Sequence, residues 1–317
     1  MRVLSLFDGI SCARVALERA GTPVEMYYAC EIDKNAIKVS TKNYPDIVQL
    51  GDVRNVKGFP VDLLVGGSPC TDLSIAKKNR KGLDGTASGL FWEFVRLKKE
   101  CCPRWFLLEN VASMPKADKD IITREMGVEP VMINAALVSA QSRKRLFWTN
   151  IPFVMPQDRG IMLKDILEPD GEVDERMVSG GKAFCLTASY SKTSKEPEEK
   201  EASHSAEKKQ RTLVKVGRDI GRRLTDAGIR ADYNKDIPIQ RRIEIRTDDK
   251  CGTLTSVQKD NLVVSEHRIR KLTPIECERL QGLPDNYTEG IAMTNRYRAL
   301  GNAFNVEVVR SILKSCA

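Results

Sequence analysis

Apolar residues in the first half of the chain fall into short runs, and stretches with helical spacing separate these runs. Four runs predict buried strands: Arg2–Phe7, Met26–Glu31, Asp62–Gly66 and Trp105–Glu109. Helical spacing at Ala13–Ala20 and Asn35–Lys42 predicts two helices between the first three strands. Strands that alternate with helices over short connections form a parallel sheet covered by helices, so the pattern predicts an α/β fold.

The pattern changes after about Pro156. Ser189–Gln210 has few apolar residues and nearly cancelling charges, which is typical of a solvated loop. Short β-like runs with many arginines occupy Arg211–Val264, and helical spacing returns at Thr273–Gln281. The stretch from Asn302 onward predicts a closing helix. We therefore predict an α/β body, residues 1–155 completed by 266–317, with a smaller, mostly β insert at 156–265.

Net charge and cysteine content indicate which partner the protein binds and which cellular compartment it occupies. The chain carries 51 Lys and Arg against 43 Asp and Glu, a net charge of +8, and this balance suits a polyanionic partner such as nucleic acid. No apolar run reaches about 18 residues, so no membrane span is expected. The apolar pattern begins at Met1, which predicts no signal peptide. Nine scattered cysteines without a C-x-x-C predict neither disulfides nor a metal site, and favour a reduced cytoplasmic setting, or a nuclear one in a eukaryote.

Ligands of such sheets bind at the carboxyl ends of the strands. The first predicted strand is followed by a turn in which Gly9 would let a cofactor approach the backbone, although it can also be a simple strand-to-helix turn. Glu31 ends the second strand and can accept hydrogen bonds from ribose hydroxyls, whereas Asp33 suits a helix N-cap better. Asp52 can accept from an adenine amino group. Together these ends indicate an adenosine-containing cofactor.

The segment Gly66–Leu73 is the sharpest feature of the sequence. Two glycines and a proline predict a tight turn after a buried strand, and this turn would present Cys70 at the sheet edge. A cysteine is most often a small buried hydrophobe, but on a rigid turn near several arginines a nucleophilic thiolate is also plausible.

Two further strand ends carry candidate chemistry. Glu109 ends a long apolar strand, and a carboxyl group in such surroundings should have a raised pKa and can donate a proton; the alternative is a solvent-facing terminus. Gln141, Arg143 and Arg145 share one face if their stretch is extended. Three donors on one face suit a base carbonyl, a phosphate and a carboxylate, and a solvated basic strand is the alternative.

Seven blocks of the chain, in this order, resemble the motifs of the C5-cytosine DNA methyltransferase family. They are L-F-D-G-I-S (Leu6–Ser11), G-D-V (Gly51–Val53), G-G-S-P-C (Gly66–Cys70), E-N-V (Glu109–Val111), Q-S-R-K-R (Gln141–Arg145), R-K-L-T-P-I-E-C-E-R-L-Q-G-L-P (Arg270–Pro284) and L-G-N-A-F (Leu300–Phe304). The blocks span nearly the whole chain, and G-G-S-P-C-T-D-L-S is similar to the eukaryotic de novo branch. The resemblance implies a Rossmann-like domain that binds S-adenosyl-L-methionine, with a target-recognition domain at 156–265.

The resemblance also implies roles for single residues. Cys70 is the nucleophile that adds to cytosine C6, Glu109 contacts the N3 and amino edge of the base, and Arg143 and Arg145 lie beside it. Cofactor contacts are implied at Phe7, Asp8, Gly9, Ile10, Ser11, Glu31, Ile32, Asp52, Val53, Pro69, Leu90, Asn302 and Ala303. The implied partner is double-stranded DNA, from which the target base must be flipped. We assume a monomer.

The chain departs from the family pattern at a few positions. Ser5 and Ser11 replace a frequent Asp and Gly, Thr71 replaces the usual Gln, and Ala303 replaces a common Ser. None of these changes removes a catalytic group.

Three alternatives remain open from the sequence. An RNA methyltransferase of the tRNA-aspartate type shares the domain but usually has a Cys-Phe-Thr tripeptide, which this chain lacks. A non-catalytic DNA-binding regulator would be expected to have lost the catalytic set, which is intact here. A nicotinamide oxidoreductase would be expected to carry G-x-G-x-x-G, which is absent.

Overall fold

The computed structural model describes residues 1–69, 88–168, 215–223, 236, 238–245, 262–265 and 268–316. Its main sheet has seven strands in the order β3-β2-β1-β4-β5-β7-β6. Their bounds are β1 Arg2–Leu6, β2 Met26–Cys30, β3 Val48–Gln49, β4 Leu63–Gly67, β5 Trp105–Val111, β6 Val131–Asn134 and β7 Lys144–Thr149. The predicted α/β fold is confirmed.

The expected all-parallel sheet is only partly correct. Strands β1 to β5 are parallel, but β7 runs antiparallel to both of its neighbours, β5 and β6. The reason is the connection between β6 and β7: only Ala135–Leu137 (η4) forms a helical turn there, and so short a link returns the chain as a hairpin.

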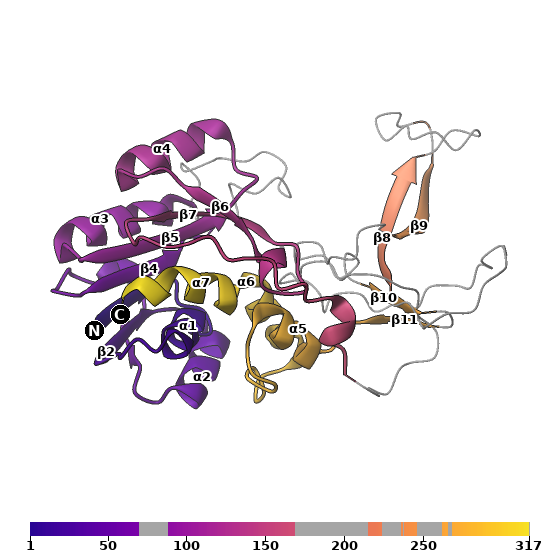
Figure 1. Ribbon diagram of the computed structural model, residues 1–317, viewed down its shortest axis with the longest axis horizontal. Coiled ribbons are helices and arrows are strands. Elements are labelled where there is room, and N and C mark those ends of the chain that lie inside the picture. Colours follow the sequence, from indigo (N-terminus) through magenta and orange to yellow (C-terminus); the bar gives the residue numbers. More distant parts are fainter. Residues whose placement is uncertain are drawn as a thin grey trace.

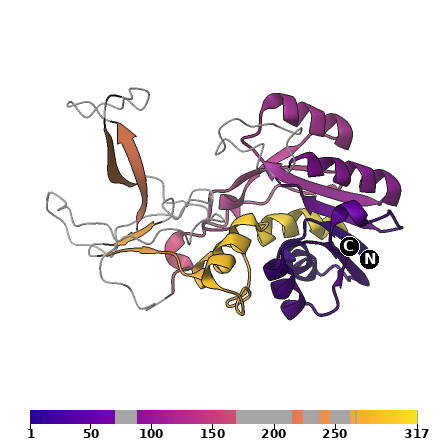
Figure 2. The same cartoon turned by 180° about the vertical axis from the view of Figure 1, so that it is seen from behind.

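Helices cover both faces of the main sheet, as Figures 1 and 2 show. The helices α3 and α4 lie on one face, and α1 packs with α7 on the other. The bounds are α1 Cys12–Ala20, α2 Lys34–Asn43, α3 Phe91–Cys101, α4 Lys116–Met126, α5 Pro274–Gln281, α6 Met293–Asn302 and α7 Val306–Leu313. The C-terminal helices thus return to the N-terminal half of the sheet and complete its cover.

Side-chain alternation along the strands divides the core into two clusters. In β1, Val3 belongs to the cluster under α1 and α7, whereas Leu4 and Leu6 belong to the cluster under α3 and α4. Both faces of the central strands are therefore buried, and this explains why their sequences are nearly continuous apolar runs rather than alternating ones.

Local capping chemistry sets the helix ends. Gly21 ends α1 in the left-handed conformation, with φ 73°, and Asp33 caps α2 by accepting a hydrogen bond from the Asn35 amide at 2.9 Å. The predicted closing helix is two helices: Asn302 is the last residue of α6, and α7 begins at Val306. The break arises because Asn305 caps α7, accepting from the Val308 amide at 3.1 Å.

A second, four-stranded sheet lies apart from the main one in both views (Figures 1 and 2). Its antiparallel strands are β8 Lys215–Arg223, β9 Ile239–Ile245, β10 Leu262–Ser265 and β11 Arg268–Lys271. Strands β8 and β9 and most of β10 fall where the sequence predicted short β-like runs, at Arg211–Val264, whereas β11 lies beyond that range. In the described part of the chain, none of the helices combines the length and apolar character needed to cross a membrane.

Candidate active site

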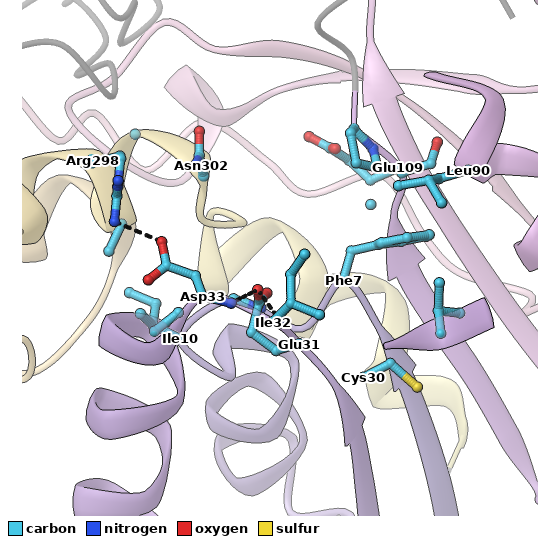
Figure 3. A pocket seen from close by; sticks show the side chains of 18 of the residues that line it. Phe7, Ile10, Cys30, Glu31, Ile32, Asp33, Leu90, Glu109, Arg298 and Asn302 are labelled. Carbon is cyan, nitrogen blue, oxygen red and sulfur yellow. Dashed lines mark hydrogen bonds and ion pairs between the residues drawn. The ribbon is translucent and has the colours of Figure 1, made fainter. Parts of the chain in front are cut away.

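A pocket of about 360 Å³ opens at the carboxyl ends of β1, β2, β4 and β5 (Figure 3). It lies where ligands of open α/β sheets bind, beside the central strand β1 at which the strand order reverses. The sequence-predicted residues that line it are Phe7, Gly9, Ile10, Glu31, Ile32, Asp52, Val53, Pro69, Leu90, Glu109, Arg143, Arg145 and Asn302. The fold therefore brings together residues that are up to about 300 positions apart in the sequence.

The turn after β1 forms one wall of this pocket. The strand ends at Leu6, one residue earlier than predicted, because Phe7 has φ 57° and leaves the extended conformation. Gly9 also has a positive φ, 60°, and a Cβ added there would meet no atom within 4 Å. The space above Gly9 is thus open, which is the condition for a ligand to approach the backbone at this glycine.

Glu31 holds the backbone around the pocket in place. Its Oε2 accepts a hydrogen bond from the Gly9 amide at 2.8 Å, and its Oε1 accepts from the Ile32 and Asp33 amides, each at 2.8 Å. The neighbouring Ile32 is 69% exposed although it is a large apolar residue. A carboxylate beside an uncovered apolar side chain suits a ribose with an attached flat base.

The third acidic strand end is already paired in this structure. Asp52 caps the short helix η1 (Val53–Asn55), and the Arg54 guanidinium donates to both of its carboxylate oxygens, at 3.0 and 3.1 Å from Nε. These hydrogen bonds lower the pKa of Asp52 to about 2, so its carboxylate is ionised and can accept hydrogen bonds.

The two glycines before the Pro-Cys pair belong to β4 and not to a turn, so that part of the prediction is wrong. Neither has a positive φ; they are required because of close packing. A Cβ on Gly66 would lie 2.8 Å from the Leu6 carbonyl oxygen, and one on Gly67 would lie 2.7 Å from Phe304 Cε1 and 3.3 Å from Glu109 Oε2. Cys70 itself, like Thr71, lies outside the described residues.

Glu109 and Arg145 form an ion pair on adjacent strands. Arg145 Nε lies 2.8 Å from Glu109 Oε1, and each side chain is only 12% exposed. The register of β5 and β7 brings them together, because Arg145 pairs with Val111 and thus lies diagonally across from Glu109. The following residue, Asn110, donates to the Ser68 hydroxyl at 3.0 Å and joins β5 to the segment that leads to Cys70.

Arg143 and Arg145 both line the pocket, but Gln141 does not, so the predicted common face holds for two of the three residues. Gln141 is fully buried outside the pocket, because β7 begins only at Lys144 and strand alternation does not extend back to position 141. The guanidinium of Arg143 donates to the carbonyl oxygens of Gly301 at 3.3 Å and Ala303 at 3.0 Å.

Asp8, Ser11 and Ala303 are the predicted cofactor contacts that do not line the pocket; all three are buried. Other residues line it without having been predicted, above all on α6. Asn295, Arg298 and Ala299 do so one or two helical turns before Asn302. Their spacing from Asn302 places them on one helix face, and this signal in the sequence could have identified them.

The strand order and the pocket at the carboxyl edge, which is lined by carboxylates and arginines, are those of a Rossmann-like methyltransferase fold. The family model for C-5 cytosine-specific DNA methylases matches residues 1–317. The chain therefore belongs to this family of DNA (cytosine-5) methyltransferases, enzymes that take their methyl group from S-adenosylmethionine.

Curated relatives cover almost the whole chain. The chain is 28% identical over 347 residues to the type II methyltransferase M.Bsp6I of Bacillus sp. (strain RFL6), covering 99% of this chain and 98% of that protein. It is 26% identical over 334 residues to the type II methyltransferase M.HhaI of Haemophilus parahaemolyticus, covering 98% and 93%.

Solved structures agree on the fold. The Entamoeba histolytica methyltransferase EhMeth superimposes with a TM-score of 0.62 at 15% identity, and the S. pombe Dnmt2 methyltransferase with 0.58 at 17% identity. Each comparison covers 99% of this chain and 97% of the other.

Proposed function

We propose that this protein methylates C5 of cytosine in duplex DNA with the pocket at the carboxyl edge of its main sheet as the active site. The observation that carries the proposal is the meeting of two sets of residues in one pocket. Acidic strand ends suited to a nucleoside, Glu31 and Asp52, line it together with the ion pair of Glu109 and Arg145.

The lining of the pocket fits S-adenosylmethionine. Glu31 would hold the ribose, Asp52 the adenine amino group, and Ile32 with Phe7 would offer apolar contact to the adenine ring. The open space above Gly9 would admit the cofactor close to the backbone. The bound cofactor supplies an electrophilic methyl group; the protein residues bind it, orient it and exclude water.

The remaining residues prepare the cytosine. The Cys70 thiolate adds to C6, forming a carbon–sulfur bond, while Glu109 donates a proton toward N3, so that C5 becomes nucleophilic. After C5 has gained the methyl group, a base removes the C5 proton and the Cys70–C6 bond breaks, which regenerates the thiolate. N3 returns its proton to the Glu109 carboxylate, so that the acid is restored as well. Arg145 orients Glu109 through the ion pair and lies beside the base.

The second sheet is proposed to serve target recognition. The sequence places the catalytic domain at residues 1–155 and 266–317 and the recognition domain at 156–265. Leu163 is fully buried in the main core and β11 (Arg268–Lys271) belongs to the second sheet, so we propose that the recognition domain begins after residue 168 and ends with β11. The candidate arginines are Arg218, Arg222 and Arg223 in β8, Arg241 and Arg242 in β9, and Arg246, which lies outside the described residues.

Substitution of these arginines tests the recognition role. Loss of a base contact should relax one position of the target by about 1–3 kcal/mol, whereas loss of a phosphate contact should weaken all sites alike. If none of the arginine substitutions changes site choice or DNA affinity, the recognition assignment is wrong.

We further propose that the enzyme acts as a monomer in a reducing, cytoplasmic setting. Free thiols in the core, among them Cys12, Cys30 and Cys277, support the reducing setting.

Methyl transfer provides the direct test of the function. Labelled S-adenosylmethionine is incubated with the protein and either mixed-sequence duplex DNA or RNA, and the nucleosides are then separated. We expect label on 5-methylcytosine in DNA. Label on adenine, on the amino group of cytosine, or only on RNA would refute the proposal.

A further inference from the structure

Ser11 has an unusual backbone and an unusual use of its side chain. It stands at the N-cap of α1 with φ 60° and ψ 37°, in the left-handed region that L-residues other than Gly, Asn and Asp seldom occupy. Serine is a preferred N-cap residue, yet its side chain makes no capping hydrogen bond. The hydroxyl group is used elsewhere, and the next contacts show where.

The Ser11 hydroxyl donates to Asp8 Oδ2 and lies 2.6 Å from the Ser40 hydroxyl. Because the single hydroxyl proton of Ser11 goes to Asp8, Ser40 must be the donor to Ser11. Ser40 in turn accepts from Gln49 Nε2 at 3.2 Å. On the other side, the Tyr27 hydroxyl donates to Asp8 Oδ1 at 2.7 Å.

These bonds form one directed network that ends on Asp8 from both sides. Its members come from β2 (Tyr27), α2 (Ser40), β3 (Gln49) and the turn between β1 and α1 (Asp8 and Ser11). Ser11 and Ser40 are fully buried, and Asp8 is 7% exposed. Buried hydrogen bonds that converge on Asp8 in this way hold the turn in place, because a movement of Ser11 or Ser40 would leave a buried hydroxyl or carboxylate oxygen without its partner.

The network lies under the cofactor pocket rather than in it. Asp8 and Ser11 do not line the pocket, but their neighbours Phe7, Gly9 and Ile10 do. The Gly9 amide, held between Asp8 and Ile10, donates to Glu31 at 2.8 Å. The position of this turn relative to Glu31 thus depends on where Asp8 and Ser11 are held.

We propose that Ser11 is a positioning residue for cofactor binding. Together with Ser40, Asp8 and Tyr27, it holds the turn at Phe7–Ser11 in the left-handed geometry that forms the pocket wall. The hydrogen bonds to Asp8 and Ser40 offset the strain of a serine at a position where glycine is at ease. Asp8 and Ser11 then act through the turn, and not by touching the cofactor. The inference rests on the proposed function, because it assigns the pocket to S-adenosylmethionine.

Two substitutions at position 11 separate backbone strain from hydrogen bonding. Ser11→Gly removes the hydroxyl but tolerates φ 60°, whereas Ser11→Ala removes the hydroxyl and keeps the strain. Ser40→Ala breaks the network without changing the turn itself. Thr41→Ala, at the exposed neighbouring position of α2, is the matched control.

Calorimetry measures the Kd for S-adenosylhomocysteine. Steady-state methylation of duplex DNA gives kcat and the KM for S-adenosylmethionine. For Ser11→Ala we expect Kd and KM to rise about tenfold while kcat falls at most about twofold. Ser11→Gly and Ser40→Ala should give smaller increases of about threefold. Thr41→Ala should match the wild type.

Unchanged Kd and KM in Ser11→Ala and Ser40→Ala would overturn the inference. A fall in kcat with unchanged Kd would do so as well, because it would place Ser11 in the chemical step. If Ser11→Ala does not fold, Ser40→Ala and Tyr27→Phe decide by the same criteria. A wild-type protein that does not bind S-adenosylhomocysteine would refute the proposed function instead.

Discussion

Arg298 Nη2 lies 2.7 Å from Asp33 Oδ2, and this ion pair joins two residues that are 265 positions apart in the sequence. Asp33 is the N-cap of α2 and Arg298 belongs to α6, so the pair connects two elements on the same side of the pocket (Figure 3). Both side chains line the pocket and are more than a third exposed. The pair therefore closes the wall between the N-terminal and C-terminal segments without being buried.

Asp33 allows the ion pair to be separated from the helix cap. Asp33→Asn keeps a side-chain acceptor for the Asn35 amide but loses the charge, so Kd for S-adenosylhomocysteine should rise by no more than about fivefold, as for an exposed pair. Asp33→Ala also loses the cap and should lower the free energy of unfolding by about a further 1 kcal/mol. Calorimetry and urea unfolding measure the two effects. Equal stability of both variants would contradict the capping role.

Glu31→Ala should weaken cofactor binding more than DNA binding. The substitution removes the acceptor of three backbone amides as well as the proposed ribose contact, and unsatisfied partners cost about 1–3 kcal/mol. Asp52→Ala should act in the same direction. Glu25→Ala, an exposed change before β2, serves as the control. Calorimetric titration with S-adenosylhomocysteine measures the loss; unchanged affinity in both variants would mean that the adenosine site lies elsewhere.

Glu109→Gln should lower kcat by about 10²–10⁴, the range for loss of a general acid, with little change in the affinity for S-adenosylhomocysteine. The amide keeps the size of the side chain but can neither donate an acidic proton nor form the ion pair with Arg145. Glu129→Gln, at an exposed position before β6, should leave the rate unchanged. Single-turnover methylation kinetics provide the measurement. A rate close to that of the wild type would remove Glu109 from the chemistry.

DNA with 5-fluorocytosine at the target should form a covalent adduct through Cys70. After the methyl group has been added, release requires the C5 substituent to leave as a cation; hydrogen can do so but fluorine cannot. The adduct should require S-adenosylmethionine, and Cys70→Ala should form none although it still binds DNA through phosphate contacts. Cys102→Ala, which changes an exposed thiol, should still form it. Denaturing electrophoresis and peptide mapping identify the linked residue, and an adduct on another cysteine would exclude Cys70.

The buried carboxylate of Asp8 should make stability depend on pH. Burial raises the pKa of Asp8 to about 6 from 3.8, against hydrogen bonds from Ser11 and Tyr27, and the nearby Glu31 adds to the rise. Below pH 3.8 Asp8 is protonated in the folded and in the unfolded protein, so it does not lower the free energy of unfolding. Above about pH 6 it is ionised in both, and the burial of the charge in the folded protein lowers the free energy of unfolding by about 3 kcal/mol. The neighbouring thiols do not interfere, because burial also raises the pKa values of Cys12 and Cys30.

Stability relative to Asp8→Asn should therefore fall as the pH rises from about 4 to about 7. Urea unfolding of both proteins across this range measures the difference. A difference that is constant with pH, or one that grows in favour of the wild type, would contradict the buried, ionised Asp8.

Much of the fold could be predicted from local patterns. The four apolar runs became β1, β2, β4 and β5, and the helical spacing at Ala13–Ala20 and Asn35–Lys42 lies within α1 and α2. The direction of β7 could not be predicted, because it depends on the hairpin with β6 and not on a sequence period. The role of Gly66 and Gly67 was also missed, since only the packed sheet brings Leu6 and Phe304 against them.

For the candidate site, the sequence by itself determined which chemical groups are present and in which order. Strand ends bearing Glu31, Asp52 and Glu109, and the ordered motifs from Leu6 to Phe304, were sufficient to indicate an adenosine cofactor and a cytosine-modifying enzyme. These signals are local, because each depends on a strand period, a turn or a short motif.

Only the tertiary structure decided which of these groups meet. The ion pairs of Glu109 with Arg145 and of Asp33 with Arg298, and the network that places Asp8 and Ser11 beneath the pocket, depend on sheet register and on the return of α6 to the N-terminal half. Contacts of this kind join residues far apart in the chain. Their geometry is set by the packing of whole elements, which no local period of the sequence encodes.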